Sequence, residues 1–201
     1  MIMFRVTTFL LLLSISFACN KSKTVDPYTV ATIAGDFIQV VVEIPAGTNH
    51  KIEFDHLTGE FKNDQIDGKD RIINFLPYPG NYGFIPGTLM EKEQGGDGDA
   101  LDVLVICESV PTASLIQVIP IGALVLNDQG EIDTKLIAIP ADPNLQVIKA
   151  EGFMDFSLRY DAARRIIEDW FQNYKGAGGV EIVRWEDEDY AWARVKKWTK
   201  E

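Results

Sequence analysis

Short apolar runs rich in β-branched residues alternate along the chain with polar, glycine-containing connections. Residues 37–44 read F-I-Q-V-V-V-E-I before Pro45, so we expect a strand that ends there. In residues 51–54, K-I-E-F, polar and apolar side chains alternate, which places Lys51 and Glu53 on one face of a second strand. Further apolar runs predict strands over residues 103–106, 136–139 and 180–185, and a pair of strands within residues 115–126.

Helical periodicity begins only late in the chain. It predicts a helix over residues 158–174, with a packing face formed by Ile166, Ile167, Trp170, Phe171 and Tyr174. A second, shorter helix is expected over residues 190–199. Residues 75–87 contain three Pro and three Gly, which argues against a regular element there.

Composition narrows the class of protein. With 201 residues and 46% hydrophobic content, the chain is long enough for one domain with a sizeable core. Its 30 acidic and 19 basic residues give a formal charge of −11, which disfavours nucleic acid as a partner. Many short strands followed by helices predict an α+β fold, mainly β, with a small barrel and flanking helices at its C-terminal end.

The first residues have the pattern of an export signal. A positive start with Arg5 precedes an apolar run over residues 9–17 that is too short to span a bilayer. Because Cys19 follows S-F-A, the segment resembles a bacterial lipobox, in which the cysteine is lipidated; an ordinary secretory signal with an incidental Cys19 is the alternative. We assign residues 1–18 to the signal peptide, 19–35 to the lipidated N-terminus and tether, and 36–201 to the folded domain.

An acidic cluster stands at the start of the apolar strand over residues 103–106. Asp97, Asp99 and Asp102 fall within six residues, among glycines that allow the backbone to turn sharply. Carboxylates this close repel one another unless a cation lies among them, and oxygen ligands suit Mg²⁺, Mn²⁺ or Ca²⁺. A solvated acidic turn is the alternative for this cluster taken alone.

Further charged residues stand at the ends of predicted strands, and a barrel gathers strand ends at its mouth. We therefore expect one rim to collect the carboxylates of Glu43, Asp97, Asp99, Asp102, Asp128 and Asp133. The same rim would carry Lys51, Arg71, Lys135 and Lys175, with Tyr78, Tyr82 and Tyr174. Metal-binding carboxylates ringed by cations suit phosphoryl hydrolysis, because both neutralise phosphate oxygens.

At this point the chain resembles the family I, soluble-type, Mg²⁺-dependent inorganic pyrophosphatases. The matching segments are V-V-V-E-I-P-A-G, K-I-E-F, D-R, P-Y-P-G-N-Y-G-F-I-P, D-G-D-A-L-D-V-L-V, I-G-A-L-V-L-N-D-Q-G-E-I-D-T-K-L-I-A-I-P and N-Y-K, in order, over residues 36–186. D-x-D-x-x-D with the downstream D-x₄-D-x-K is a specific pattern. The resemblance implies an OB-like, five-stranded closed barrel with helices packed outside.

The resemblance also implies roles for the acidic residues. Asp97, Asp102 and Asp133 would bind a first metal, and Asp102 would help to bridge to a second. Asp128 and Asp133 would face a metal carried by the substrate, and Glu43 would reach a further one. Asp99 would be the base that activates the water between metals.

Phosphate binding would fall to Lys51, Arg71, Tyr78, Lys135, Tyr174 and Lys175. Lys135 would also assist the leaving group, Glu53 would tune Lys51, and Tyr82 would hydrogen-bond near the nucleophile. Two departures from common relatives affect Gln129, where many carry an acid, and the segment from Arg71 to Tyr78, which is one residue shorter than in common bacterial members.

These observations lead to an expected function: Mg²⁺-dependent hydrolysis of inorganic pyrophosphate by a metal-bridged water. Several Mg²⁺ per site are expected, with Mn²⁺ as a substitute and Ca²⁺ as an inhibitor. The Cys19 lipid would be the only membrane contact of an extracytoplasmic, membrane-anchored bacterial lipoprotein, and a homo-oligomer is compatible with the family. The alternatives are a catalytically weak, metal-dependent polyphosphate- or pyrophosphate-binding lipoprotein, an interaction module, and hydrolysis of nucleotide phosphate esters.

Overall fold

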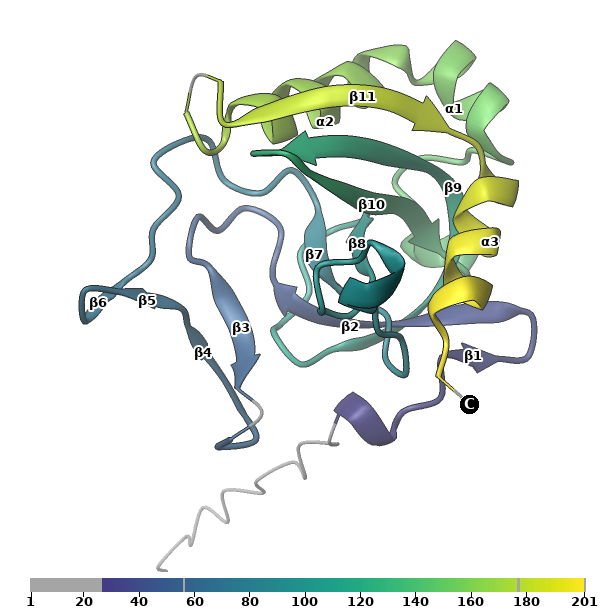
Figure 1. Ribbon diagram of the computed structural model, residues 1–201. Coiled ribbons are helices and arrows are strands. Elements are labelled where there is room, and N and C mark those ends of the chain that lie inside the picture. The colour runs from purple at the N-terminus through teal and green to yellow at the C-terminus, as the bar shows by residue number, and fades with distance from the viewer. Residues whose placement is uncertain (1–26, 56, 177, 201) are drawn as a thin grey trace, which may run out of the picture.

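The computed structural model describes residues 27–55, 57–176 and 178–200, so Cys19 and the signal segment lie outside the described residues. Figure 1 shows one main sheet, with helices packed outside it and a pair of small hairpins projecting to one side. The seven strands of the main sheet are β1 (Ile33–Ala34), β2 (Phe37–Ile44), β7 (Asn81–Phe84), β8 (Asp102–Val105), β9 (Leu115–Asp128), β10 (Glu131–Pro140) and β11 (Val180–Glu186).

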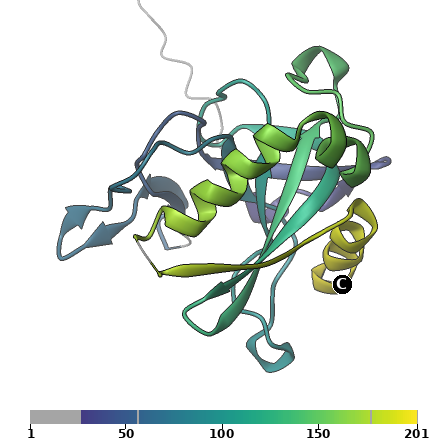
Figure 2. The same cartoon turned by 90° about the horizontal axis from the view of Figure 1, so that it is seen from above.

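Five of these strands close into a barrel, which confirms the predicted OB-like fold. The order around the ring is β2–β7–β8–β10–β9, and β9 pairs with β2 to complete it. Neighbours run antiparallel except β8 and β10, which are parallel. β1 adds to the outer edge of β2, and β11 pairs with the second half of β9 (Figures 1 and 2).

β8, the second half of β9 and residues 136–140 of β10 are buried on both faces, which explains their continuous apolar runs. Val103 and Val105 of β8 pack in a core with α3 (Glu188–Trp198), whereas Leu104 packs in a second core with α1 (Phe153–Arg159) and α2 (Asp161–Asn173). Because successive side chains of a strand point to opposite faces, a strand with two buried faces needs apolar residues at every position.

The expectation that residues 75–87 hold no regular element is wrong, because β7 lies within them and is fully buried. A glycine makes this possible: a Cβ at Gly83 would lie 2.0 Å from the carbonyl oxygen of Val41 on β2. Without that Cβ the two strands approach closely enough to pair. The prolines flank the strand and leave its ladder intact.

Other element boundaries also differ from the sequence prediction. The helix expected over residues 158–174 is two helices, α1 and α2, separated at Tyr160, and Ile166 is 61% exposed and does not join the packing face. The region 115–126 is one long strand, β9. Asp133 and Lys135 lie inside β10 and not before it, because β9 and β10 pair up to the two-residue turn Gln129–Gly130.

An arm projects from the barrel between β2 and β7. It contains the hairpin of β3 (Ile52–Asp55) and β4 (Glu60–Asn63), followed by the hairpin of β5 (Gln65–Ile66) and β6 (Lys69–Asp70). Figure 1 shows the β5–β6 hairpin as the outermost part of this arm, on the left. We call residues 51–71 the arm below.

Three short 3₁₀ helices complete the fold: η1 (Pro27–Thr29), η2 (Lys92–Gln94) and η3 (Pro143–Leu145). Residues 32–34, which the sequence analysis places in the tether, belong to the folded unit: Thr32 Oγ1 donates to the carbonyl of Pro86 at 2.8 Å and β1 pairs with β2. No helix among the described residues is long and apolar enough to cross a membrane.

Candidate active site

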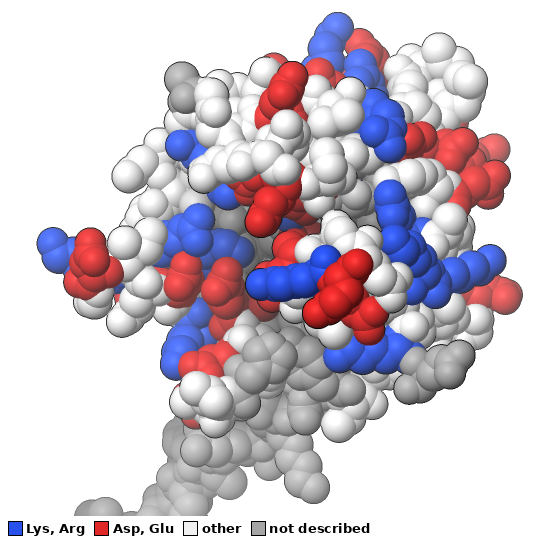
Figure 3. Space-filling view, in the orientation of Figure 1, with Lys and Arg blue, Asp and Glu red and all other residues white. Residues whose placement is uncertain are grey.

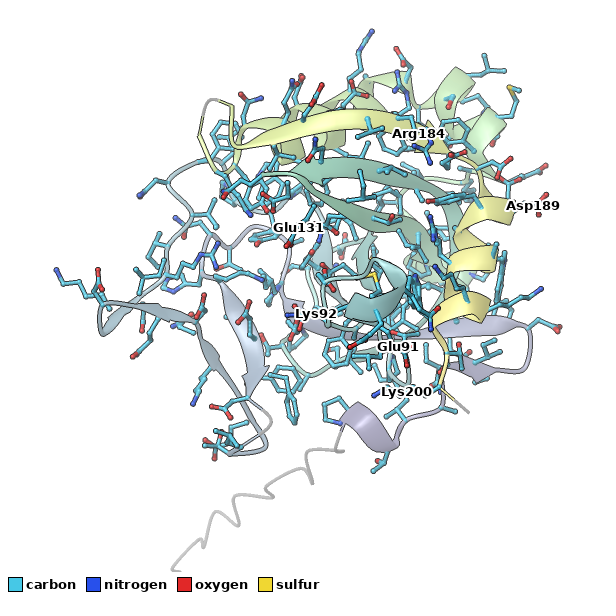
Figure 4. The ribbon with its side chains drawn as sticks, viewed as in Figure 1. Glu91, Lys92, Glu131, Arg184, Asp189 and Lys200 are labelled. Atoms are coloured by element: carbon cyan, nitrogen blue, oxygen red, sulfur yellow. The ribbon has the colours of Figure 1, made fainter. Side chains whose placement is uncertain are left out.

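The predicted site residues come together around one cavity of about 200 Å³ between the barrel and the arm. Every predicted site residue of the folded domain except Glu43 lines it. The lining consists of Lys51, Glu53, Arg71, Tyr78, Tyr82, Asp97, Asp99, Asp102, Asp128, Asp133, Lys135, Trp170, Phe171, Tyr174 and Lys175. Figure 3 shows acidic and basic side chains gathered around a hollow between the arm and the barrel. In Figure 4, Glu131 and Lys92 flank this opening.

Glu43 lies next to this cavity and not within it. It lines an adjoining cavity of about 540 Å³, and Lys51, Glu53, Asp99 and Asp102 line both. Its Oε1 accepts a hydrogen bond from the backbone N–H of Phe54 at 2.9 Å. Burial raises the pKa of Glu43 to about 7, so this carboxyl is easily neutralised in the absence of a cation.

The acidic loop is shaped by its own short-range contacts. Asp97 Oδ1 accepts from the backbone N–H of Asp99 at 2.9 Å, and Gly98 between them has a φ of +93°, a conformation that favours glycine. Leu101, fully buried, anchors the loop to the barrel at the start of β8. Burial and the neighbouring charge of Asp97 raise the pKa of Asp99.

Lys135 occupies the centre of the site. Its ammonium group forms an ion pair with Asp102 Oδ2 and lies 2.6 Å from Asp133 Oδ2, while Tyr82 donates to Asp102 Oδ2 at 2.6 Å. Burial lowers the pKa of Lys135, but the two carboxylates outweigh burial and the pKa ends above its usual range. Burial and repulsion from Asp102 hold the pKa of Asp133 above its usual value despite Lys135.

The donor set fits hard divalent cations. Asp128 Oδ1 and Asp133 Oδ1 are buried and have no hydrogen-bond partner within the described part of the chain. A buried, unpartnered carboxylate oxygen is costly, and a metal ion would satisfy it. Among the described residues no three acidic, His or Cys side chains converge on one point, and Lys135 and Lys175 form ion pairs with Asp102, Asp133 and Asp128.

Four basic side chains line the cavity. Lys51 and Arg71 come from the arm, and Lys135 and Lys175 come from the side of the barrel. Lys51 Nζ lies 2.8 Å from Glu53 Oε1, as the strand alternation predicted, and 5.8 Å from the ring centre of Tyr82. Burial lowers the pKa of Lys51, yet Tyr78, Glu53 and Asp102 together raise it above its usual value. On the opposite side, Lys175 follows α2 and pairs with Asp128.

An aromatic wall closes one side of the cavity, and the sequence analysis missed part of it. Trp170 and Phe171 line the cavity as well as the core. The Trp170 ring stacks on Tyr174, with centres 4.9 Å apart and planes at 12°, and its Nε1–H donates to the carbonyl of Leu76 at 2.8 Å. The helical spacing of Trp170 and Phe171 predicted that they pack in the core, but not that they line the cavity. Burial raises the pKa of Tyr174 to about 12, so its phenol stays protonated.

Comparison with known proteins decides the family. The family model for inorganic pyrophosphatase matches residues 40–201. The chain belongs to the inorganic pyrophosphatase family. It is 40% identical over 146 residues to the inorganic pyrophosphatase of Sulfolobus acidocaldarius, covering 71% of this chain and 76% of that protein.

Bacterial family members are also similar over most of their length. The chain is 32% identical over 178 residues to the inorganic pyrophosphatase of Neisseria meningitidis serogroup A, covering 86% of this chain and 95% of that protein. The solved structure of the Thermus thermophilus inorganic pyrophosphatase has a TM-score of 0.71 and 26% identity, covering 86% of this chain and 95% of that one. The family resemblance read from the motifs is thus confirmed, as is the fold.

The structure places Gln129, the position at which many relatives were expected to carry an acid, in a tight turn next to the site, and nothing in the structure explains the Gln there. It lies in the β9–β10 turn with a φ of +55°, beside Asp128, and lines a small surface cavity with Glu131 and Lys175. Cys107 is half-buried, packs against the core, and accepts a hydrogen bond from Asn81 Nδ2 at 3.2 Å.

Proposed function

We propose that this chain hydrolyses inorganic pyrophosphate to two phosphate ions with the help of Mg²⁺. The observation that carries the proposal is the cavity itself, in which five aspartates from three segments of the barrel lie near four basic side chains. The cavity lies between Lys51 and Arg71 of the arm and Lys135 and Lys175 of the barrel side. A small, highly charged anion accompanied by divalent cations matches this arrangement of charges.

The basic and phenolic side chains bind the substrate. Lys51, Arg71 and Lys175 neutralise phosphate oxygens, and Tyr78 and Tyr174 donate hydrogen bonds to them. Lys135, buried and held in its charged form, supplies a positive charge at the departing phosphate. Tyr82 holds the Asp102 carboxylate in place through its 2.6 Å hydrogen bond. Glu53 keeps Lys51 aimed at the cavity.

The acidic side chains hold the metal ions and the attacking water. Asp97, Asp102 and Asp133 would hold Mg²⁺. Asp128 and Glu43 would be further ligands at the edges of the site. Bound Mg²⁺ neutralises phosphate charge and makes water more acidic. Asp99 would act as the base for the attacking water, and burial with the neighbouring Asp97 raises the pKa of this carboxyl. Mn²⁺ is expected to replace Mg²⁺, and Ca²⁺ to inhibit.

The test is phosphate release from pyrophosphate by residues 20–201, assayed with Mg²⁺, with Ca²⁺ and with EDTA. We expect rapid release with Mg²⁺, little with Ca²⁺ and none with EDTA. In parallel, Mg²⁺ should raise the melting temperature, because it binds the folded state and relieves repulsion among the aspartates. Absence of release from a folded, Mg²⁺-stabilised protein would overturn the assignment as a hydrolase and favour the alternative of a metal-dependent pyrophosphate-binding protein.

The proposed setting is a bacterial membrane outside the cytoplasm, with the folded domain facing the periplasm or the cell surface. The lipobox-like S-F-A-C ending at Cys19 supports lipidation there, and the enzyme would then release phosphate from pyrophosphate outside the cytoplasm. In cell fractionation, the full chain should follow the membranes, and Cys19→Ser should not. Deletion of the gene should abolish growth on pyrophosphate as the sole phosphorus source; unchanged growth would contradict the scavenging role.

A further inference from the structure

Lys51 and Arg71, the two basic residues of the arm that line the catalytic cavity, are linked by backbone hydrogen bonds to each other and to Asp64. The backbone N–H of Lys51 donates to the carbonyl of Arg71 at 3.0 Å, and that of Arg71 donates to the carbonyl of Asp64 at 2.7 Å. The N–H of Asp64 donates to the carbonyl of Lys51 at 2.7 Å and closes the cycle. The backbone of Asp64 is thus hydrogen-bonded to the backbones of both Lys51 and Arg71.

A tight hairpin sets the position of Asp64 opposite Arg71. β5 and β6 pair Gln65 with Asp70 and Ile66 with Lys69. The turn residues Asp67 and Gly68 have φ values of +53° and +72°, the geometry of a two-residue turn that matches the strand twist. Because such a turn fixes the register, the residues at its neck, Asp64 and Arg71, face each other.

The side chain of Asp64 continues this contact. One carboxylate oxygen, Oδ2, lies 3.0 Å from Nη1 of Arg71, and the other, Oδ1, accepts from the backbone N–H of Gln65 at 2.7 Å. Both oxygens therefore have donors. A guanidinium carries five N–H donors in a rigid fork, so one bond to Asp64 orients the fork and leaves the other donors for an anion.

Asp64 itself faces away from the reaction. It lines a cavity of about 580 Å³ on the β3–β4 side of the arm, which shares only Glu53 with the catalytic cavity that Arg71 lines. The side chain of Asp64 can then affect pyrophosphate through Arg71, the one residue lining the catalytic cavity with which its carboxylate is seen to pair among the described residues. Asp70, one residue before Arg71, makes a different set of contacts: its carboxylate accepts from Asn63 Nδ2 at 3.0 Å and Gln65 Nε2 at 3.3 Å.

We infer that Asp64 is a positioning residue for Arg71, and that the β5–β6 hairpin is the device that presents this guanidinium to a phosphate group of the substrate. The inference rests on the proposed function, because it assumes that the catalytic cavity binds pyrophosphate. An Arg on a short exposed arm would otherwise sample several rotamers, and fixing it beforehand lowers the entropy cost of binding the anion.

The test compares steady-state kinetics of Asp64→Asn with Asp70→Asn as the matched control on the same hairpin. Asparagine keeps the acceptor for the Gln65 N–H but loses the charge that holds Arg71. We expect Asp64→Asn to raise KM for pyrophosphate about 5- to 10-fold with kcat within about twofold, since the pair is partly exposed to solvent. Asp70→Asn should leave both constants unchanged, and Asp64→Glu should restore part of the loss.

A double-mutant cycle separates positioning from a general loss of structure. If Asp64 acts through Arg71, Asp64→Asn should have no further effect on KM when Arg71→Ala is already present. An equal additional effect in both backgrounds, or an unchanged KM in Asp64→Asn beside an impaired Arg71→Ala, would overturn the inference. Failure of the proposed function is seen separately, because the unmodified protein would then release no phosphate.

Discussion

The barrel edge and the arm contribute opposite charges to one cavity, but the support behind them differs. Asp102 and Asp133 lie on β8 and β10, strands whose apolar residues are buried on both faces. Lys51 and Arg71 lie on the arm, whose tips carry Leu57 at 97% exposure and Ile66 at 56%. These two carboxylates are thus positioned by the core, whereas the basic side chains of the arm are positioned by local hydrogen bonds and ion pairs.

The largest expected effect comes from damage to the barrel. Leu104→Ala should lower the free energy of unfolding by about 3 kcal/mol, because Leu104 is fully buried and leaves a cavity next to Asp102. Denaturant unfolding measures this. The control Leu115→Ala, at a side chain 50% exposed, should change stability by less than about 0.5 kcal/mol. Equal losses in the two variants would show that the barrel wall is not the rigid region.

On the arm, a conservative change should alter binding and leave stability alone. Arg71→Lys keeps the charge but loses the fork that pairs with Asp64, so KM should rise about 10-fold with little change in unfolding midpoint. Arg184→Lys, at an exposed pair with Glu186, is the control and should leave KM unchanged. A destabilised Arg71→Lys would mean that the arm supports the fold and not only the site.

The β9–β10 turn offers a smaller, stabilising change. Gln129 and Gly130 both have positive φ, at +55° and +100°, and Asn-Gly suits such a turn better than Gln-Gly. Gln129→Asn should therefore raise the free energy of unfolding by about 0.5 kcal/mol. A loss of stability would show that the Gln side chain makes an essential contact.

The smallest effect concerns the pH dependence of the arm. The Lys62 ammonium, with the N–H groups of Thr58 and Leu57, lowers the pKa of Asp55 from 3.8 to about 2. A pKa lowered by folding adds stability above the unfolded value, and this is lost as pH falls through the folded one. Asp55→Asn should therefore be slightly less stable than the unmodified chain at pH 6, and the gap should narrow below about pH 4.

The matched variant for Asp55 removes its partner. Lys62→Gln deletes the ammonium group that contacts Asp55, and it should reproduce part of the loss at pH 6. Denaturant midpoints at pH 6 and pH 3 measure both variants. A gap that stays constant with pH would show that Asp55 stabilises the turn through something other than its charge.

The barrel and the arm also differ in how well the sequence predicts their structure. Continuous apolar runs rich in β-branched residues and the spacing of Asp97, Asp99 and Asp102 sufficed for most barrel strands and for the acidic loop, because both signals lie in neighbouring residues. β7 was missed because its pairing depends on the close approach of Gly83 to Val41, far away in the chain.

The pairing of Asp64 with Arg71 was missed for a similar reason. It depends on a hairpin register that only the left-handed turn at Asp67 and Gly68 sets. Trp170 and Phe171 were placed correctly on a packing face, but their share in the cavity wall depends on where α2 lies against the barrel. Helical periodicity says which face is buried and not what it is buried against.

The most direct test of the account is phosphate release by Asp99→Asn beside the unmodified chain, at saturating Mg²⁺ and pyrophosphate. Asn has nearly the same shape but cannot take a proton, so kcat should fall by about 10²- to 10⁴-fold while Mg²⁺ still raises the melting temperature. If Asp99→Asn turned over pyrophosphate at the rate of the unmodified chain, the acidic loop would not contain the base, and the central assignment would be wrong.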